Sequence, residues 1–199
     1  MKFDFNKETT REGTHSVQYE GTEALFGVGG LEPFWIADMD IETPEAIREA
    51  IKERIDNGIF GYTIWQNEQF YEPIKHWWQS RYNTVLSDTD IHYSPTVLFT
   101  VGEALRQVTR ERDGIILTTP SYNKFPSLIE SNNRQIVESP LIYDNDLKEY
   151  FLDVNHFTSL CERDDVSMYI HCNPHNPTGK VWTREELQTI KDICAANNI

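Results

Sequence analysis

The chain has 199 residues, enough for one domain with a substantial core or for part of a larger protein. Its 32 acidic residues outnumber 18 basic ones and give a formal net charge of −14, so we expect neither nucleic acid nor an anionic membrane as a partner. Aromatic residues make up 12% of the chain, too many for an acidic disordered segment. The protein is therefore expected to be globular.

The cysteines and the N-terminal segment give expectations about location. The three cysteines, Cys161, Cys172 and Cys194, have no Cys-x-x-Cys spacing, so neither a disulfide framework nor a thiolate metal site is indicated. The first residues lack the apolar core of a signal peptide, and no segment approaches the ~18 apolar residues of a membrane span. These features predict a cytoplasmic protein.

The first part of the chain predicts an extended arm followed by two helices. Residues 1–30 are polar and contain several glycines, which favours an irregular arm. The first helix is expected to have Thr43 as its N-cap and Pro44 as its first residue and to end at Asn57-Gly58, with one face formed by Ile47, Ile51 and Ile55. The second helix is expected over residues 68–81.

A third helix is predicted after Ser94, with Ser94 as its cap, Pro95 as its first residue and Gly114 as its end. Its apolar residues recur at helical spacing (Val97, Val101, Leu105 and Val108). The free N–H groups and the positive dipole at its N-terminus suit a phosphate, although every capped helix has such an end.

Strands and helices alternate in the second half of the chain. Apolar runs predict strands over residues 114–119, 135–138 and 168–172, and a final helix is expected after Thr183, with Glu186 completing a capping box. This alternation predicts an α/β fold with a mostly parallel sheet flanked by helices.

Two Asn-Pro turns follow the strand predicted over residues 168–172, in the sequence NPHNPTGK at 173–180. Asn173 is expected to be structural, whereas the amide of Asn176 can give and accept hydrogen bonds in fixed directions. Ligands of open α/β sheets bind at the carboxyl ends of strands. The segment Ser94 to Val97, Tyr122 and Asn176 all lie at such junctions, so we expect them at one edge of the sheet.

Four motifs in matching order resemble the MalY/PatB-type cystathionine β-lyases, which are pyridoxal-phosphate (PLP) enzymes of the class I/II aminotransferase superfamily with fold type I. They are WIADMD at 35–40, GYTIW at 61–65, TPSYNKF at 119–125 and CNPHNPTGKVW at 172–182. The resemblance implies that residues 1–57 form an N-terminal arm and a first helix contributing to the small domain. Residues 58–199 would then be the N-terminal half of the PLP-binding large domain.

The resemblance also implies roles for individual residues in cofactor binding. Tyr122 would stack on the pyridine ring, and Asn176 would donate to the ring O3′ and help to hold the substrate carboxylate. Backbone N–H groups of Thr96 and Val97, with the Thr96 hydroxyl, would bind the phosphate. Tyr62 would reach the phosphate of the partner subunit in a homodimer.

Substrate binding and backbone geometry complete what the resemblance implies. The N–H of Ala37 would bind the substrate carboxylate, while Asp38 and Asp40 are expected to be turn and cap residues. The peptide bond Asn176-Pro177 is predicted to be cis, and Thr119-Pro120 is a second candidate.

Structural explanations stay open for three of these residues. Tyr122 could be a packed turn tyrosine, Asn176 could be a purely structural turn residue, and Tyr62 could be buried beside Trp65.

Two groups of residues invite other chemistry. His171, Cys172 and His175 could suggest a metal site, but they lack a second pair of ligands, so no metal is expected. Lys180 could suggest the lysine that forms a Schiff base with PLP, but in this family that lysine lies in a Ser-x-Ser/Thr-Lys context, which does not occur in this sequence.

Three catalytic groups of the family are therefore expected to be absent from these 199 residues: the Schiff-base lysine, the aspartate that pairs with the pyridine nitrogen and the arginine that grips the substrate carboxylate. The chain alone is predicted neither to hold PLP covalently nor to turn over, and its sheet is expected to have an exposed apolar edge.

The resemblance implies that the parent protein is a PLP-dependent carbon–sulfur β-lyase, releasing pyruvate, ammonia and a thiol from L-cystathionine or an L-cysteine conjugate. A PLP-dependent aminotransferase of amino acids is one alternative. The other is a non-catalytic interaction module.

Overall fold

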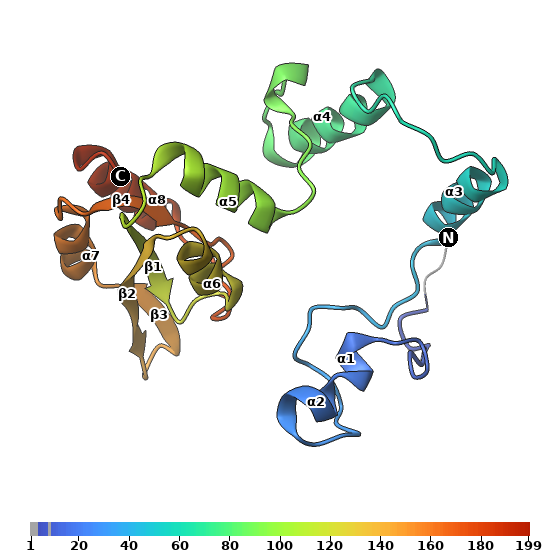
Figure 1. The fold of residues 1–199 in the computed structure, drawn as a ribbon, viewed down its shortest axis with the longest axis horizontal. Coiled ribbons are helices and arrows are strands. Elements are labelled where there is room, and N and C mark those ends of the chain that lie inside the picture. Colours follow the sequence, from blue (N-terminus) through green and yellow to red (C-terminus); the bar gives the residue numbers. More distant parts are fainter. Residues whose placement is uncertain (1–3, 8) are drawn as a thin grey trace. The chain divides into compact units, whose positions relative to one another are not determined.

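The computed structural model describes residues 4–7 and 9–199. The chain divides into two compact units, one ending at Glu72 and the other running from Pro73 to Ile199, and each is described by itself (Figure 1). Among the described residues, no helix is both long and apolar enough to cross a membrane.

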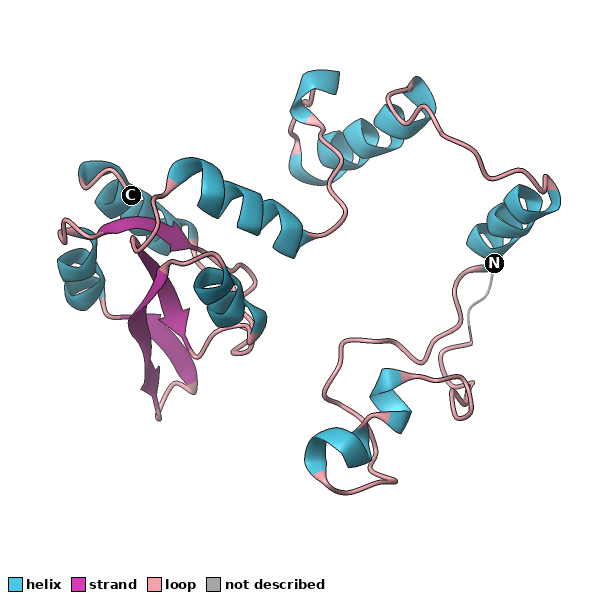
Figure 2. Ribbon diagram, in the orientation of Figure 1, coloured by secondary structure: helices cyan, strands magenta, loops and turns pink. Residues whose placement is uncertain are grey.

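The N-terminal unit consists of helices joined by long loops (Figure 2). Helices α1 (Val17–Glu20) and α2 (Thr22–Phe26) lie in the segment that was expected to be an extended arm, so that expectation is wrong. They are stabilised by a few contacts of their own: the Trp35 indole donates to the Gln18 carbonyl at 3.0 Å and packs edge-on against Phe26.

Helix α3 (Glu45–Asp56) begins one residue later than predicted. Pro44 is the N-cap rather than the first helical residue, because its ψ of 137° is extended, and Thr43 is therefore not the cap. The predicted end is confirmed: Asn57 is the C-cap and Gly58 adopts a φ of +72°, which glycine reaches without strain. Helix α4 (Glu68–Tyr82) matches its prediction to one residue.

The second unit is built on a four-stranded sheet. Strands β1 (Gly114–Thr119), β2 (Gln135–Asp144), β3 (Glu149–Leu152) and β4 (Val166–Ile170) lie in the order β3-β2-β1-β4. Strand β1 pairs in parallel with both β2 and β4, which confirms the mostly parallel sheet, and β3 pairs antiparallel with β2. Strand β3 and the longer β2 were not predicted.

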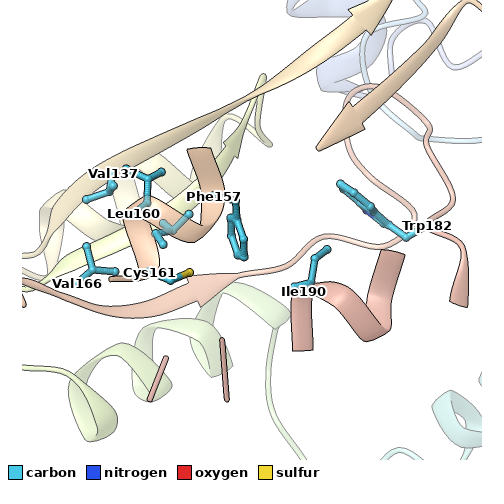
Figure 3. Close-up of a cluster of buried hydrophobic side chains, with 8 residues drawn as sticks. Val137, Phe157, Leu160, Cys161, Val166, Trp182 and Ile190 are labelled. Atoms are coloured by element: carbon cyan, nitrogen blue, oxygen red, sulfur yellow. The ribbon is translucent and has the colours of Figure 1, made fainter. Parts of the chain in front are cut away.

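Helices cover both faces of this sheet. Leu105 of α5 (Val97–Val108) and Ile129 of α6 (Lys124–Ser131) pack with Ile115 of β1 on one face. On the other face, Phe157 of α7 (Val154–Cys161) and Ile190 of α8 (Arg184–Ala196) pack in one cluster, which Figure 3 shows around Val137, Val166 and Trp182. Neighbouring residues of β1 alternate between the faces, as the pleat of a strand requires.

Of two predicted helix N-termini in this unit, one is wrong and one is confirmed. Helix α5 is capped by Thr96, whose Oγ1 accepts from the Phe99 N–H at 3.0 Å, so Ser94 is not the cap and Pro95 lies before the helix. The predicted capping box of α8 is confirmed, because Thr183 and Glu186 each accept from the other's backbone N–H.

Gly114 does not end α5, which stops at Val108, but is the first residue of β1. A Cβ at Gly114 would lie 2.8 Å from a methyl group of Val137 and 3.0 Å from one of Val166. The glycine is therefore needed because β1 approaches both of its neighbours closely.

Candidate functional site

The carboxyl ends of β1 and β4 carry two proline-containing turns side by side. Strand β1 is followed by the cis peptide Thr119-Pro120, and β4 by the cis peptides Asn173-Pro174 and Asn176-Pro177. The predicted cis bonds at Asn176-Pro177 and Thr119-Pro120 are confirmed, and the third was not predicted. Because β1 and β4 are adjacent and parallel, both turns emerge at the same edge of the sheet.

A depression between these turns brings Tyr122 and Asn176 together. Its walls come from the end of β1, the start of α6 and the turn after β4, and its lining includes Leu117, Thr118, Ser121, Phe125, Ile170, Cys172 and His175. Of the three elements predicted to converge at this edge, Tyr122 and Asn176 line the depression, whereas the segment Ser94 to Val97 is not part of its lining. Their individual roles stay predictions.

Tyr122 packs against Phe125 of α6. Its half-buried ring meets Phe125 edge-on, with ring centroids 5.4 Å apart, and its carbonyl accepts from the Phe125 N–H at 3.0 Å. This contact fixes the ring's orientation through its neighbour in α6. An aromatic face fixed in this way can stack on another flat ring.

Asn176 is exposed, and its side-chain amide makes no hydrogen bond with any residue in the described part of the chain. Its backbone N–H points back to the Cys172 sulfur, with N and Sγ 3.5 Å apart. The amide is therefore available to a ligand. Asn173 differs, because its Oδ1 accepts from the Trp182 N–H at 3.4 Å, in line with the structural role expected for it.

The N-terminus of α5 belongs to the same unit. Leu98, in its first turn, packs against the buried cluster that Tyr122 and Cys172 also border. Over residues 4–7 and 9–199, the backbone N–H groups of Val97 and Leu98 donate no hydrogen bond. The Thr96 hydroxyl caps the helix as an acceptor, and its own proton can still be donated.

A buried histidine supports the turn that carries Asn176. His175 is 2% exposed, with Nε2 3.1 Å from the Thr118 hydroxyl and Nδ1 2.9 Å from the Thr178 hydroxyl. Burial lowers its pKa, so the ring is neutral near pH 7. In the sequence, His175 was considered only as a possible metal ligand. Its position between two Asn-Pro pairs was the feature that could have indicated a structural role.

A second histidine lies at the end of β4. His171 Nδ1 is 3.0 Å from the Tyr169 hydroxyl, and burial, followed by the nearby His175, lowers the pKa of His171. Its Nε2 is buried and has no partner within the described part of the chain. Trp182 packs against both histidines and donates from its indole to the Cys172 carbonyl at 3.0 Å. Three or more His, Cys, Asp or Glu side chains do not gather into a metal-binding group anywhere in the described residues.

Lys180 is engaged in a local ion pair. Its Nζ is 2.8 Å from Glu186 Oε1, and it lies over the rings of Phe151 and Trp182 at 5.2 and 5.1 Å. Burial raises the pKa of Glu186, but hydrogen bonds from Lys180 and the Thr183 N–H outweigh it, and the net pKa is lowered. The side chain of Lys180 therefore links the turn to α8 and β3, and its exclusion as a Schiff-base residue stays a prediction.

Ala37 and Tyr62 both belong to the N-terminal unit, and both are exposed. The explanation of Tyr62 as a buried residue beside Trp65 is wrong, because the Tyr62 side chain is fully accessible and Trp65 instead packs against Phe70 and Tyr71. The binding roles of Ala37 and Tyr62 stay predictions.

Known proteins with this arrangement include carbon–sulfur lyases. The chain is 34% identical to protein MalY of Escherichia coli over 99% of its own length and 50% of the relative's. It is 35% identical to cystathionine beta-lyase PatB of Bacillus subtilis, over 98% of this chain and 50% of the relative. The PLP-bound C-S lyase from Staphylococcus hominis superposes with a TM-score of 0.90 at 32% identity, over 100% of this chain and 50% of that one.

The chain thus spans about half the length of the curated relatives it matches. The resemblance inferred from the four motifs is confirmed, and it extends over nearly the whole chain. Residues 35–199 match the protein-family model for aminotransferase class I and II. The chain therefore belongs to the aminotransferase class I and II family.

Proposed function

We propose that the protein to which this chain belongs is a PLP-dependent carbon–sulfur β-lyase. It would release pyruvate, ammonia and a thiol from L-cystathionine or an L-cysteine conjugate. The observation that carries the proposal is the meeting of Tyr122 and Asn176 in one depression at the carboxyl ends of β1 and β4. The choice of a lyase rests on the similarity to PatB and to the Staphylococcus hominis C-S lyase.

The residues of this edge fit a phosphorylated pyridine. The Tyr122 ring offers a flat face, and the Asn176 amide, which makes no hydrogen bond within the described part of the chain, can donate to the ring O3′. The N–H groups of Thr96 and Val97 and the dipole of α5 would bind the phosphate, where the overall charge of −14 would otherwise oppose an anion. Tyr62 would add a phosphate contact to the partner subunit.

Each residue of this chain would bind or orient rather than transfer protons. PLP supplies an electron sink that weakens the Cα–H bond of a bound amino acid. Asn176 and the Ala37 N–H would hold the substrate carboxylate and so determine which bond of Cα is directed toward the electron-accepting ring. Proton transfer at Cα would fall to the lysine that this sequence lacks, and the 199-residue chain alone is therefore expected to be inactive.

Assembly, location and domain organisation belong to the same proposal. We propose a homodimer in the cytoplasm, with residues 1–57 contributing to a small domain and residues 58–199 forming the first half of the large domain. All three cysteines are free, which suits a reducing compartment.

A binding titration tests the cofactor site on the chain itself. Pyridoxine 5′-phosphate lacks the aldehyde of PLP, so it cannot react with surface lysines, and its binding can be followed by tryptophan fluorescence. We expect binding by the 199-residue chain that weakens about tenfold in Y122A, the loss of roughly one stacking contact. The matched control Tyr143→Ala, in β2 outside the depression, should leave the affinity unchanged. Equal weakening by both changes would contradict the site.

Product analysis tests the reaction class, using a longer form of the protein that carries the Schiff-base lysine. Pyruvate and ammonia formed from L-cystathionine without a keto-acid acceptor are expected for a lyase. The aminotransferase alternative uses the same Tyr122 and Asn176, but it would require the acceptor and would return an amino acid derived from it.

A further inference from the structure

A connected set of hydrogen-bonded side chains lies beneath the depression, and His175 is its central member. One ring nitrogen of His175 binds the Thr118 hydroxyl at 3.1 Å, and the other binds the Thr178 hydroxyl at 2.9 Å. A threonine hydroxyl can donate or accept, so a neutral imidazole satisfies both partners in either tautomer. One side chain thereby links the end of β1 to the turn after β4.

The turn itself is closed by backbone hydrogen bonds. The His175 N–H donates to the Lys180 carbonyl, and the Gly179 N–H donates to the His175 carbonyl, both at 2.7 Å. These bonds hold the turn's shape but not its position on the sheet. The His175 ring provides a positional link, because Thr118 lies in β1 and is 2% exposed.

A second hydrogen-bonded pair lies at the end of β4. The Tyr169 hydroxyl is 3.0 Å from Nδ1 of His171, and the rings of His171 and His175 both pack against Trp182. Burial raises the pKa of Tyr169, so the phenol keeps its proton. Thr118 lies in β1, which pairs with β2 on one side and β4 on the other, so His175 binds a hydroxyl that cannot easily move. In a buried network of this kind, losing one member leaves a desolvated polar group behind.

We infer that His175 is a positioning residue: through its hydrogen bond to Thr118 it sets where Asn176 lies relative to Tyr122, and so determines how well the depression binds the pyridine ring. Asn176 follows His175 directly, and Tyr122 lies four residues after Thr118, so the bond joins the two halves of the depression at their bases. The ligand's identity rests on the proposed function, whereas the positioning of the turn does not.

Two pairs of variants distinguish a role of His175 in positioning the turn from a role limited to packing. Thr118→Val removes the hydroxyl at nearly constant volume, whereas Thr118→Ser keeps it. His175→Gln can place an amide where Nε2 reaches Thr118, whereas His175→Asn can place one where Nδ1 reaches Thr178. A role limited to packing would favour Val over Ser at 118 and would not depend on which ring nitrogen is imitated.

The experiment compares these variants in the 199-residue chain, after circular dichroism has shown that each keeps the fold. The first measurement is amide hydrogen exchange, and T118V is expected to speed exchange at His175 and Gly179 about tenfold, the equivalent of one lost hydrogen bond, with Leu117 in β1 unaffected. T118S should resemble the unaltered chain. The second is the affinity for pyridoxine 5′-phosphate, expected to fall about tenfold in T118V and H175N and less than about threefold in T118S and H175Q.

Equal exchange rates in T118V and T118S would overturn the inference, as would equal ligand affinities within each pair. Failure of the unaltered chain to bind pyridoxine 5′-phosphate would instead count against the proposed function. In that case the exchange rates at His175 and Gly179 still decide whether the hydrogen bond to Thr118 positions the turn.

Discussion

The two units of this chain use apolar residues in opposite ways. In the second unit, Phe157, Leu105 and Ile116 are fully buried between the sheet and its helices. In the first unit, α3 has a regular apolar face, yet Ile47, Ile51 and Ile55 are all more than half exposed, at 51, 54 and 57%. The described residues of α3 include none that is buried. Helical spacing therefore predicts that a helix forms, but not that anything within its own unit covers it.

The largest effect expected from this comparison is at the two phenylalanines that differ most in exposure among the described residues. Phe157→Ala empties a site with 0% exposure and should lower the free energy of unfolding by ~3–5 kcal/mol. Phe34→Ala removes the same ring where it is 90% exposed and should change stability by less than ~0.5 kcal/mol. Urea unfolding followed by far-UV circular dichroism measures both. Similar losses would mean that the first unit has a core that its exposed side chains do not show.

Close backbone approach gives the second contrast. Gly114→Ala would place a methyl group 2.8 Å from Val137 and 3.1 Å from the Asp165 carbonyl, and overpacking of this kind costs ~1–3 kcal/mol. Gly61→Ala meets nothing within 4 Å and should be neutral or slightly stabilising. The midpoints of urea unfolding provide the comparison. A harmless Gly114→Ala would show that the three strands can move apart.

Sequence patterns predicted the second unit better than the first for a physical reason. The apolar run of β1 and the capping box at Thr183 are patterns of residues a few positions apart, and both were predicted correctly. The cis bond at Asn176-Pro177 was also predicted correctly, but from the family resemblance. Strand β3 was missed because its four residues are stabilised by pairing with β2 rather than by a pattern of their own.

The candidate site was predictable only in part. Tyr122 and Asn176 could be placed at one edge because parallel strands end together. The hydrogen bond between His175 and Thr118 joins residues 57 positions apart, and the spacing of neighbouring residues does not predict such a contact. The cap of α5 was misplaced for a simpler reason: Ser94 and Thr96 are both good caps, and the extended backbone of Thr96 at φ −154° and ψ 159° decides between them.

The helix caps give a third and smaller contrast. Thr183 accepts from the Glu186 N–H, so Thr183→Ala should cost ~1 kcal/mol of stability. Thr43 precedes α3 without capping it, and Thr43→Ala should have almost no effect. Thermal unfolding by circular dichroism is sensitive enough, since 1 kcal/mol shifts the midpoint by a few degrees in a chain of this size. Equal losses of stability in the two variants would mean that Thr43 does cap α3.

The smallest expected effect is a dependence on pH that belongs to the second unit alone. Burial lowers the pKa of His175 and, together with His175, that of His171, whereas the unfolded chain binds a proton near the ordinary value of 6.5. Because the folded pKa is the lower one, the stability linked to these rings is complete above pH 6.5 and declines as the pH falls toward the folded values.

His175→Gln should flatten the decline between pH 7 and 5 by less than ~1.4 kcal/mol per pH unit, the limit for one proton. Urea midpoints at several pH values measure this slope, and His15→Gln, which alters a 98% exposed side chain in the first unit, is the matched control. An unchanged slope in His175→Gln would mean that this ring takes up a proton without leaving its place between Thr118 and Thr178.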